Sequence, residues 1–117
     1  MPQVRLLCID DDPAARAVYT NMLTRHGYEV IMSAGADFVP ELNAGSIDAV
    51  VLAFETSSRR GGQFAADIKR RQPRLPVIMV SDCKAVIEDA GRFVDGAVGK
   101  NTASHDLLMQ LRLLNVV

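Results

Sequence analysis

The chain has 117 residues, 49% of them hydrophobic, and a formal net charge of −1. This size and composition predict a single globular domain, residues 1–117, that buries a core without disulfides. The near-neutral charge gives no general attraction to nucleic acid or membranes, and no apolar run approaches the roughly 18 residues of a membrane span. Asp10–Asp12 interrupt the layout of a signal peptide, so we expect a cytoplasmic protein.

The first elements are a short apolar run followed by a helix. Residues 4–9 have the length and branched side chains of a buried strand. Residues 13–25 suit a helix, because a proline begins the segment and a glycine follows it. Ala14, Val18 and Met22 recur once per turn, so we expect them on the core side of this helix.

The rest of the chain continues to alternate between strands and helices. The run at residues 49–54 is continuously apolar, which is typical of a strand buried on both faces. The remaining expected strands are 29–32, 77–80 and 96–99, and the remaining expected helices are 37–42, 61–71, 85–90 and one marked by Leu107, Leu108, Leu111 and Leu114.

Strands that each lead into a helix form a parallel sheet with helices on both faces. Sites in such sheets lie outside the carboxyl ends of the strands. The residues at those ends include Asp10, Asp11, Ala53–Glu55, Ser81 and Lys100. Carboxylates, a hydroxyl and a lysine at one edge are suited to hold a metal ion and a phosphoryl group.

The acidic run after the first strand is the most prominent of these features. Asp12 precedes Pro13 and is suited to cap the helix. Asp10 and Asp11 repel each other unless a cation compensates them, and such oxygen ligands suit Mg²⁺. A solvated acidic turn is an equally open interpretation of the run alone.

Four segments make the chain resemble a receiver domain of two-component response regulators over nearly its whole length. They are Leu7–Asp12, Ile47–Leu52, Pro76–Ser81 and Val94–Lys100. The resemblance implies an α/β, flavodoxin-like fold, (βα)5, whose doubly wound parallel sheet has the strand order 2-1-3-4-5. Such domains receive a phosphoryl group on an aspartate, with Mg²⁺. By resemblance, Asp11 would bind the metal directly and Asp10 through water, while Ser81 and Lys100 would contact the phosphoryl group.

The resemblance breaks at Ala53, which occupies the position of the phosphoacceptor aspartate. A methyl group can neither attack phosphorus nor bind a metal. Asp48 lies at the other end of the predicted strand and cannot replace the aspartate. Glu55 is on the same side of an extended strand as Ala53, so a weakened Mg²⁺ site of Asp10, Asp11 and Glu55 is our expectation.

Other departures from the family point the same way. Ala97 stands where the family has its switch Tyr or Phe, and Asn101 replaces the proline after the lysine. An engineered change at Ala53 would not explain these differences, so natural degeneration is the better interpretation. We therefore expect a pseudo-receiver: a signalling and protein-interaction module of a phosphorelay, and not an enzyme.

The expected partner is a protein, namely a histidine kinase, another regulator or an output domain. The surface of the fourth helix, fifth strand and fifth helix is the expected contact face, through which a homodimer could also form. We expect no nucleic-acid binding by this domain itself and no membrane contact. The basic residues at the end of the helix 61–71 are attributed to its dipole: Lys69, Arg70, Arg71 and Arg74.

Two other classes of function remain as alternatives. The first is a metal- or small-anion-sensing domain that uses Asp10, Asp11 and Glu55 with Lys100 and Arg59. The second is Mg²⁺-dependent hydrolysis of a phosphorylated substrate. No general base is legible for the second, which is the least supported.

Overall fold

The computed structural model describes residues 4–10, 13–33, 47–53, 61–81, 88, 91, 93–99 and 103–114. Its elements, in chain order, are β1 (Arg5–Asp10), α1 (Pro13–Arg25), β2 (Glu29–Ser33), β3 (Ala49–Ala53), α3 (Gly61–Arg71), β4 (Val77–Val80), β5 (Gly96–Val98) and α5 (Ala103–Leu113). The helix expected at residues 37–42 lies outside the described residues. So does the helix expected at 85–90, except for Glu88, which is helical.

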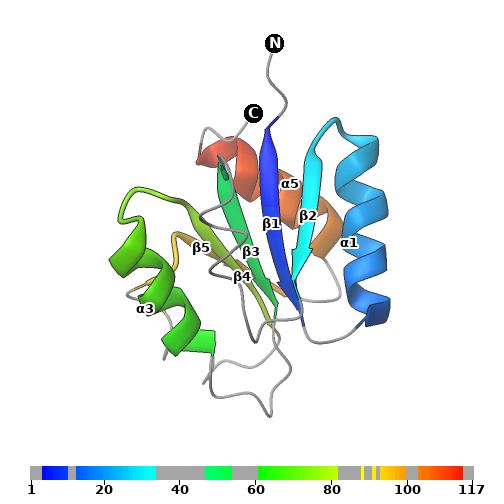
Figure 1. The fold of residues 1–117 in the computed structure, drawn as a ribbon. Helices are drawn as coiled ribbons and strands as arrows, with labels where there is room; N and C mark the ends of the chain where they lie inside the picture. The colour runs from blue at the N-terminus through cyan, green and yellow to red at the C-terminus, as the bar shows by residue number, and fades with distance from the viewer. Residues whose placement is uncertain are drawn as a thin grey trace.

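The strands form a five-stranded sheet in the order β2-β1-β3-β4-β5 (Figure 1). Every neighbouring pair is parallel. This confirms the predicted α/β architecture and its strand order 2-1-3-4-5. It follows that the described strands all present their carboxyl ends at one edge of the sheet.

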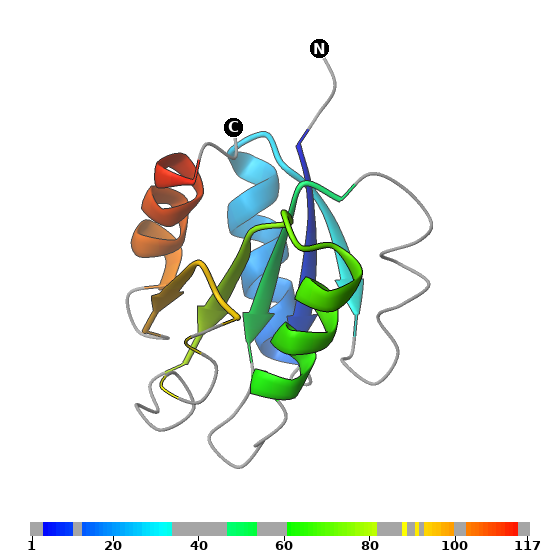
Figure 2. The same ribbon diagram turned by 90° about the vertical axis from the view of Figure 1, so that its left-hand side faces the viewer.

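Helices cover both faces of this sheet: α1 and α5 lie on one face and α3 on the other (Figures 1 and 2). Alternate residues of β1 supply the two cores, because successive side chains of a strand point to opposite faces. Leu6 packs in a cluster with Leu23 of α1 and Leu111 of α5, whereas Leu7 packs in a second cluster with Ile68 of α3. The expectation that the strand at residues 49–54 is buried on both faces is confirmed for residues 49–52, and residues 77–80 of β4 are buried in the same way.

The face of α1 that meets the core differs from the expected one. Leu23 is fully buried, whereas Val18 is 58% exposed and Ala14 is also exposed. Only Met22 of the three expected residues packs against the core cluster, and it does so partly. Five positions along a helix turn the side chain by roughly 140° from its starting direction. The helix is seated by Leu23, and Val18 therefore faces outward.

The end of α1 is formed by a Schellman motif around Gly27. The Gly27 N–H donates to the Thr24 carbonyl, and the Tyr28 N–H reaches back to the Leu23 carbonyl, both at 3.1 Å. Gly27 has φ of 91°, a left-handed conformation that glycine adopts without the Cβ penalty. Tyr28 and Leu23 lie in the same core cluster, as the apolar contact of this motif requires.

Candidate functional site

The carboxyl edge of the sheet carries a row of directly paired residues. Asp10 of β1 pairs with Ala53 of β3, Ala53 pairs with Val80 of β4, and Val80 pairs with Val98 of β5. Ser81 follows Val80 and donates its N–H to the Val98 carbonyl at 3.0 Å. The backbone of the predicted site is therefore continuous across four strands, and Ala53 is at its centre.

Of the predicted site residues, Ser81 and Ala97 are those whose side-chain burial the structure describes. Ser81 is 1% exposed and is the buried polar residue of the described part of the chain. Ala97 lies in β5 opposite Met79, is half-buried and packs against the α3-side core. For Asp10 and Ala53 the structure gives the backbone position in β1 and β3.

The other predicted site residues, Asp11, Glu55, Arg59 and Lys100, lie outside the described residues. Within the described part of the chain, no three His, Cys, Asp or Glu side chains gather closely enough to hold a metal ion. The possible chemistry at this edge therefore follows from the residue types at the strand ends. A carboxylate residue closes β1, a methyl residue closes β3 and a hydroxyl residue follows β4.

Asp48 is the nearest aspartate before Ala53, and its carboxylate is hydrogen-bonded at the opposite, amino edge of the sheet. Its Oδ2 accepts a hydrogen bond from the Arg5 N–H, and its own N–H donates to the Arg5 carbonyl, both at 2.8 Å. These two hydrogen bonds, which we call a two-way clasp, hold Asp48, the residue before β3, against Arg5, the first residue of β1. The carboxylate thus lies at the far end of β3 from Ala53.

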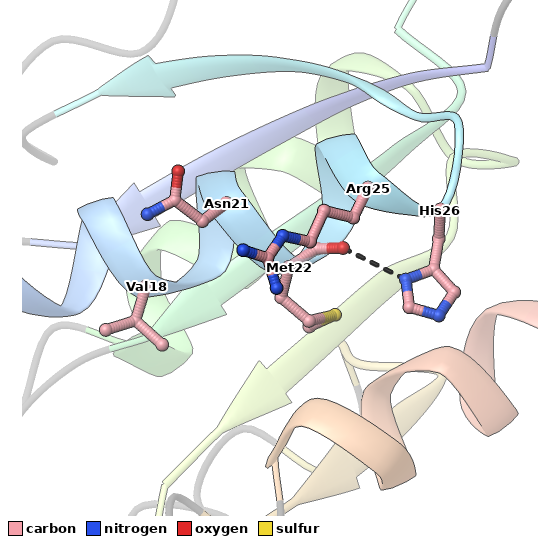
Figure 3. Close-up of a pocket in the computed structure, with 5 residues that line it drawn as sticks. All are labelled: Val18, Asn21, Met22, Arg25 and His26. Carbon is pink, nitrogen blue, oxygen red and sulfur yellow. Dashed lines mark hydrogen bonds between the residues drawn. The ribbon is translucent and has the colours of Figure 1, made fainter.

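A hollow of about 440 Å³ lies on the outer surface of α1, away from the row of paired residues. It is lined by Val18, Asn21, Met22, Arg25 and His26 (Figure 3). His26 Nδ1 lies 3.1 Å from the Met22 carbonyl oxygen, a bond that requires a proton on Nδ1. The hollow combines apolar side chains with cationic and polar groups.

One contact of a charged residue was not anticipated from the sequence. Lys69 was attributed to the helix dipole alone, but its Nζ lies 2.6 Å from Oδ2 of Asp95 and 2.8 Å from the Leu75 carbonyl oxygen. The two charged residues are 26 positions apart in the chain. No local spacing rule links side chains at that separation, so only the fold brings them together.

Comparison with known proteins identifies the family. A family model of the response regulator receiver domain matches residues 6–112. The chain is a response regulator receiver domain. Members of this family are signalling modules of two-component systems rather than dedicated enzymes. The family is the one that the motifs at the strand ends resemble.

Curated relatives of this receiver domain are transcriptional regulatory proteins. The chain is 34% identical over 77 residues to GlrR of Escherichia coli K12, a match that covers 65% of this chain and 17% of GlrR. It is 30% identical over 95 residues to TcrA of Mycobacterium tuberculosis H37Rv, covering 80% of this chain and 38% of TcrA. The chain therefore corresponds to a minor part of the length of these relatives.

Solved structures share this fold. TrrA of Thermotoga maritima, solved in complex with Mg(2+)-BeF, superposes with a TM-score of 0.86 at 22% identity over 96% of this chain and 99% of that one. CheY4 of Vibrio cholerae superposes with a TM-score of 0.83 at 17% identity, covering 99% of this chain and all of that one (100%). At these identities the likeness establishes the fold alone.

None of the helices in the described residues combines the length and the apolar character that a bilayer-spanning helix needs.

Proposed function

We propose that this receiver domain acts in a two-component phosphorelay without accepting a phosphoryl group itself, as a protein-interaction module. The observation that carries the proposal is the position of Ala53: it closes β3, directly opposite Asp10. Phosphoryl transfer to a receiver requires a nucleophilic oxygen, and an alanine methyl supplies none. The sheet is that of a receiver, but the group that would react is missing from its central strand.

Asp48, the nearest aspartate before Ala53, is not suited to replace the missing aspartate. Asp48 precedes β3 and is held by Arg5 at the amino edge. Using it as the acceptor would require the strand to slip by five residues, which would break the pairing of β3 with both β1 and β4. Glu55 follows Ala53 by two positions in the sequence, and we propose a role for it in metal binding rather than in phosphorylation.

We propose that the site keeps a weakened affinity for Mg²⁺. Asp10, Asp11 and Glu55 provide hard oxygen ligands, and Mg²⁺ often binds through one or two carboxylates while retaining several waters. Loss of the acceptor carboxylate removes one negative charge from this set. Ser81 and Lys100 are the residues proposed to contact a small anion, through a hydroxyl and an ammonium group.

The protein-contact role is supported by exposed apolar side chains on α5. Met109 and Leu113 are 48% and 71% exposed and stand one helical turn apart. They extend the proposed contact face of the fourth helix, β5 and α5, through which we propose that a partner or a second copy of the chain binds. The family match favours this signalling role over the metal- or anion-sensing alternative.

The proposal is tested with a small phosphodonor, such as acetyl phosphate, in the presence of Mg²⁺. Intact-mass spectrometry of the native chain is expected to show no phosphoryl adduct. The matched variant Ala53→Asp restores the carboxylate at the end of β3 and is expected to acquire one. A stable adduct on the native chain would overturn the proposal, because it would reveal an acceptor other than residue 53.

A further inference from the structure

Asp95, the residue before β5, forms two hydrogen bonds with Val77, the first residue of β4, one through its backbone N–H and one through its side chain. The Asp95 N–H donates to the Val77 carbonyl at 2.7 Å, and Asp95 Oδ2 accepts the Val77 N–H at 2.8 Å. The same Oδ2 also accepts a hydrogen bond from Nζ of Lys69 at 2.6 Å. One carboxylate oxygen therefore receives a strand amide and a helix cation together.

Lys69 brings a second segment into this arrangement. It lies in the last turn of α3, and its Nζ also donates to the Leu75 carbonyl at 2.8 Å. That carbonyl belongs to the connection between α3 and β4. The side chains of Lys69 and Asp95 are 20% and 35% exposed, so water screens the pair only in part. A single ammonium group thus joins α3, the α3–β4 connection and the entry to β5.

We expect the register of strand β5 to depend on such contacts, because the strand is short and, among the described strands, pairs on one side alone, with β4. It has three residues, begins with a glycine and pairs with β4 at the edge of the sheet. Val98 packs on the α1 and α5 side, whereas Ala97 packs on the α3 side. A slip of one position would exchange these faces. The clasp at Asp95 opposes such a slip before the first paired residue of β5.

We propose that Lys69 and Asp95 form a tie that couples helix α3 to the register of β5, and so positions the end of β5 at the carboxyl edge. Helix α3 begins at Gly61, after the connection that follows β3, and β5 ends with Val98 at the same edge. The tie joins the other ends of both elements. A partner that displaces the start of α3 therefore acts on β5 through Lys69.

This inference deepens the proposed function, since it assigns a coupling between two sides of the same site, but it does not depend on what residue 53 accepts. The sheet contains a natural comparison. Asp48 makes the same two-way clasp with Arg5 that Asp95 makes with Val77. Lys69, the one lysine among the described residues, contacts Asp95 rather than Asp48, so a cation from α3 distinguishes the Asp95 clasp from the Asp48 clasp.

The test uses native-state amide hydrogen exchange by NMR in Lys69→Met, Asp95→Asn and the double variant. Ser81, which donates its N–H to the Val98 carbonyl, reports the far end of the β4–β5 pairing. Asp48, which donates its N–H to the Arg5 carbonyl, reports the β1–β3 side as a reference. Asp95→Asn keeps an oxygen that accepts the Val77 N–H, so folding is retained while the charge is lost.

In Lys69→Met we expect exchange at Ser81 to accelerate about fivefold relative to Asp48, which corresponds to the loss of a part-exposed ion pair. The double variant is expected to exchange no faster than the faster single variant, because either change breaks the same tie. Arg70→Met, which removes a neighbouring cation that pairs with Asp67, is the matched control and should leave the ratio unchanged. Equal acceleration at Ser81 and Asp48, no acceleration at Ser81, or additive effects in the double variant would each overturn the tie. None of these outcomes involves a phosphodonor or Mg²⁺, so they are separate from the test of the proposed function.

Discussion

The contrast between Leu23 and Val18 on helix α1 gives a quantitative test of how the helix is seated. Leu23 is fully buried in the cluster that contains Leu107 and Leu111 of α5. Leu23→Ala should therefore lower the free energy of unfolding by about 3 kcal/mol, the sum of lost burial and a residual cavity. Val18 is 58% exposed, so its truncation forfeits only roughly 0.6 kcal/mol of apolar burial. Alanine has a higher helix propensity than valine, which stabilises the helix by roughly the same amount. Val18→Ala should therefore leave the free energy of unfolding nearly unchanged.

Urea unfolding of the two variants, followed by far-ultraviolet circular dichroism, measures both effects. The slope of free energy against urea should match that of the native chain, so that the midpoints report stability directly. A loss in Val18→Ala as large as that in Leu23→Ala would refute this seating of the helix. It would indicate that Val18, rather than Leu23, is directed into the core.

Three further predictions concern the helix end, the amino edge and the exposed face of α5. Gly27→Ala should cost about 1 kcal/mol and Gly27→Asn less in thermal unfolding, because φ is positive at this position and no atom lies within 4 Å of an added Cβ. Equal costs would contradict a backbone origin. Asp48→Ala should lower stability by about 1 kcal/mol in chemical denaturation, and Asp48→Asn by less, since the amide oxygen still accepts the Arg5 N–H. Replacing Met109 and Leu113 by serine should weaken self-association in analytical ultracentrifugation and lower stability by roughly 1.5 kcal/mol, because both side chains are only partly buried; an unfolded double variant would assign these side chains to the core.

The strand pattern could be predicted from the sequence because its signals are local. Continuous apolar runs at 49–52 and 77–80 are those of strands buried on both faces, and the structure pairs them at the centre of the sheet. The helix limits at Pro13 and Arg25 also followed from local rules, since proline favours a helix start and glycine a helix end.

The seating of α1 was harder to predict because the helix has apolar residues on more than one side. A spacing of four residues linked Val18 with Met22, but Leu23 fits the core cluster and Val18 does not. Both candidate faces satisfy the same periodicity, and only packing against the sheet decides between them. The contact of Lys69 with Asp95 was missed for a related reason, since it depends on where two distant elements meet.

The candidate site, like the fold, could be predicted from the sequence only in part. The sequence placed Asp10, Ala53 and Ser81 at strand ends, and the parallel sheet brings their backbones to one edge. The identity of residue 53 then limits the chemistry without any further geometry, because a methyl group has no lone pair to offer. The metal ligands Asp11 and Glu55 remain predictions, since they lie outside the described residues.

The central claim is that no phosphoryl-dependent switch remains at this site, and a phosphoryl mimic tests it most directly. Mg²⁺ and beryllofluoride are added to the native chain and to Ala53→Asp, and amide shifts are followed at Ser81 and Ala97. The account predicts beryllofluoride-dependent shifts at both positions in Ala53→Asp and none in the native chain. Saturable shifts of equal size in the native chain would contradict it, because they would show a phosphoryl-type ligand bound and sensed without the aspartate.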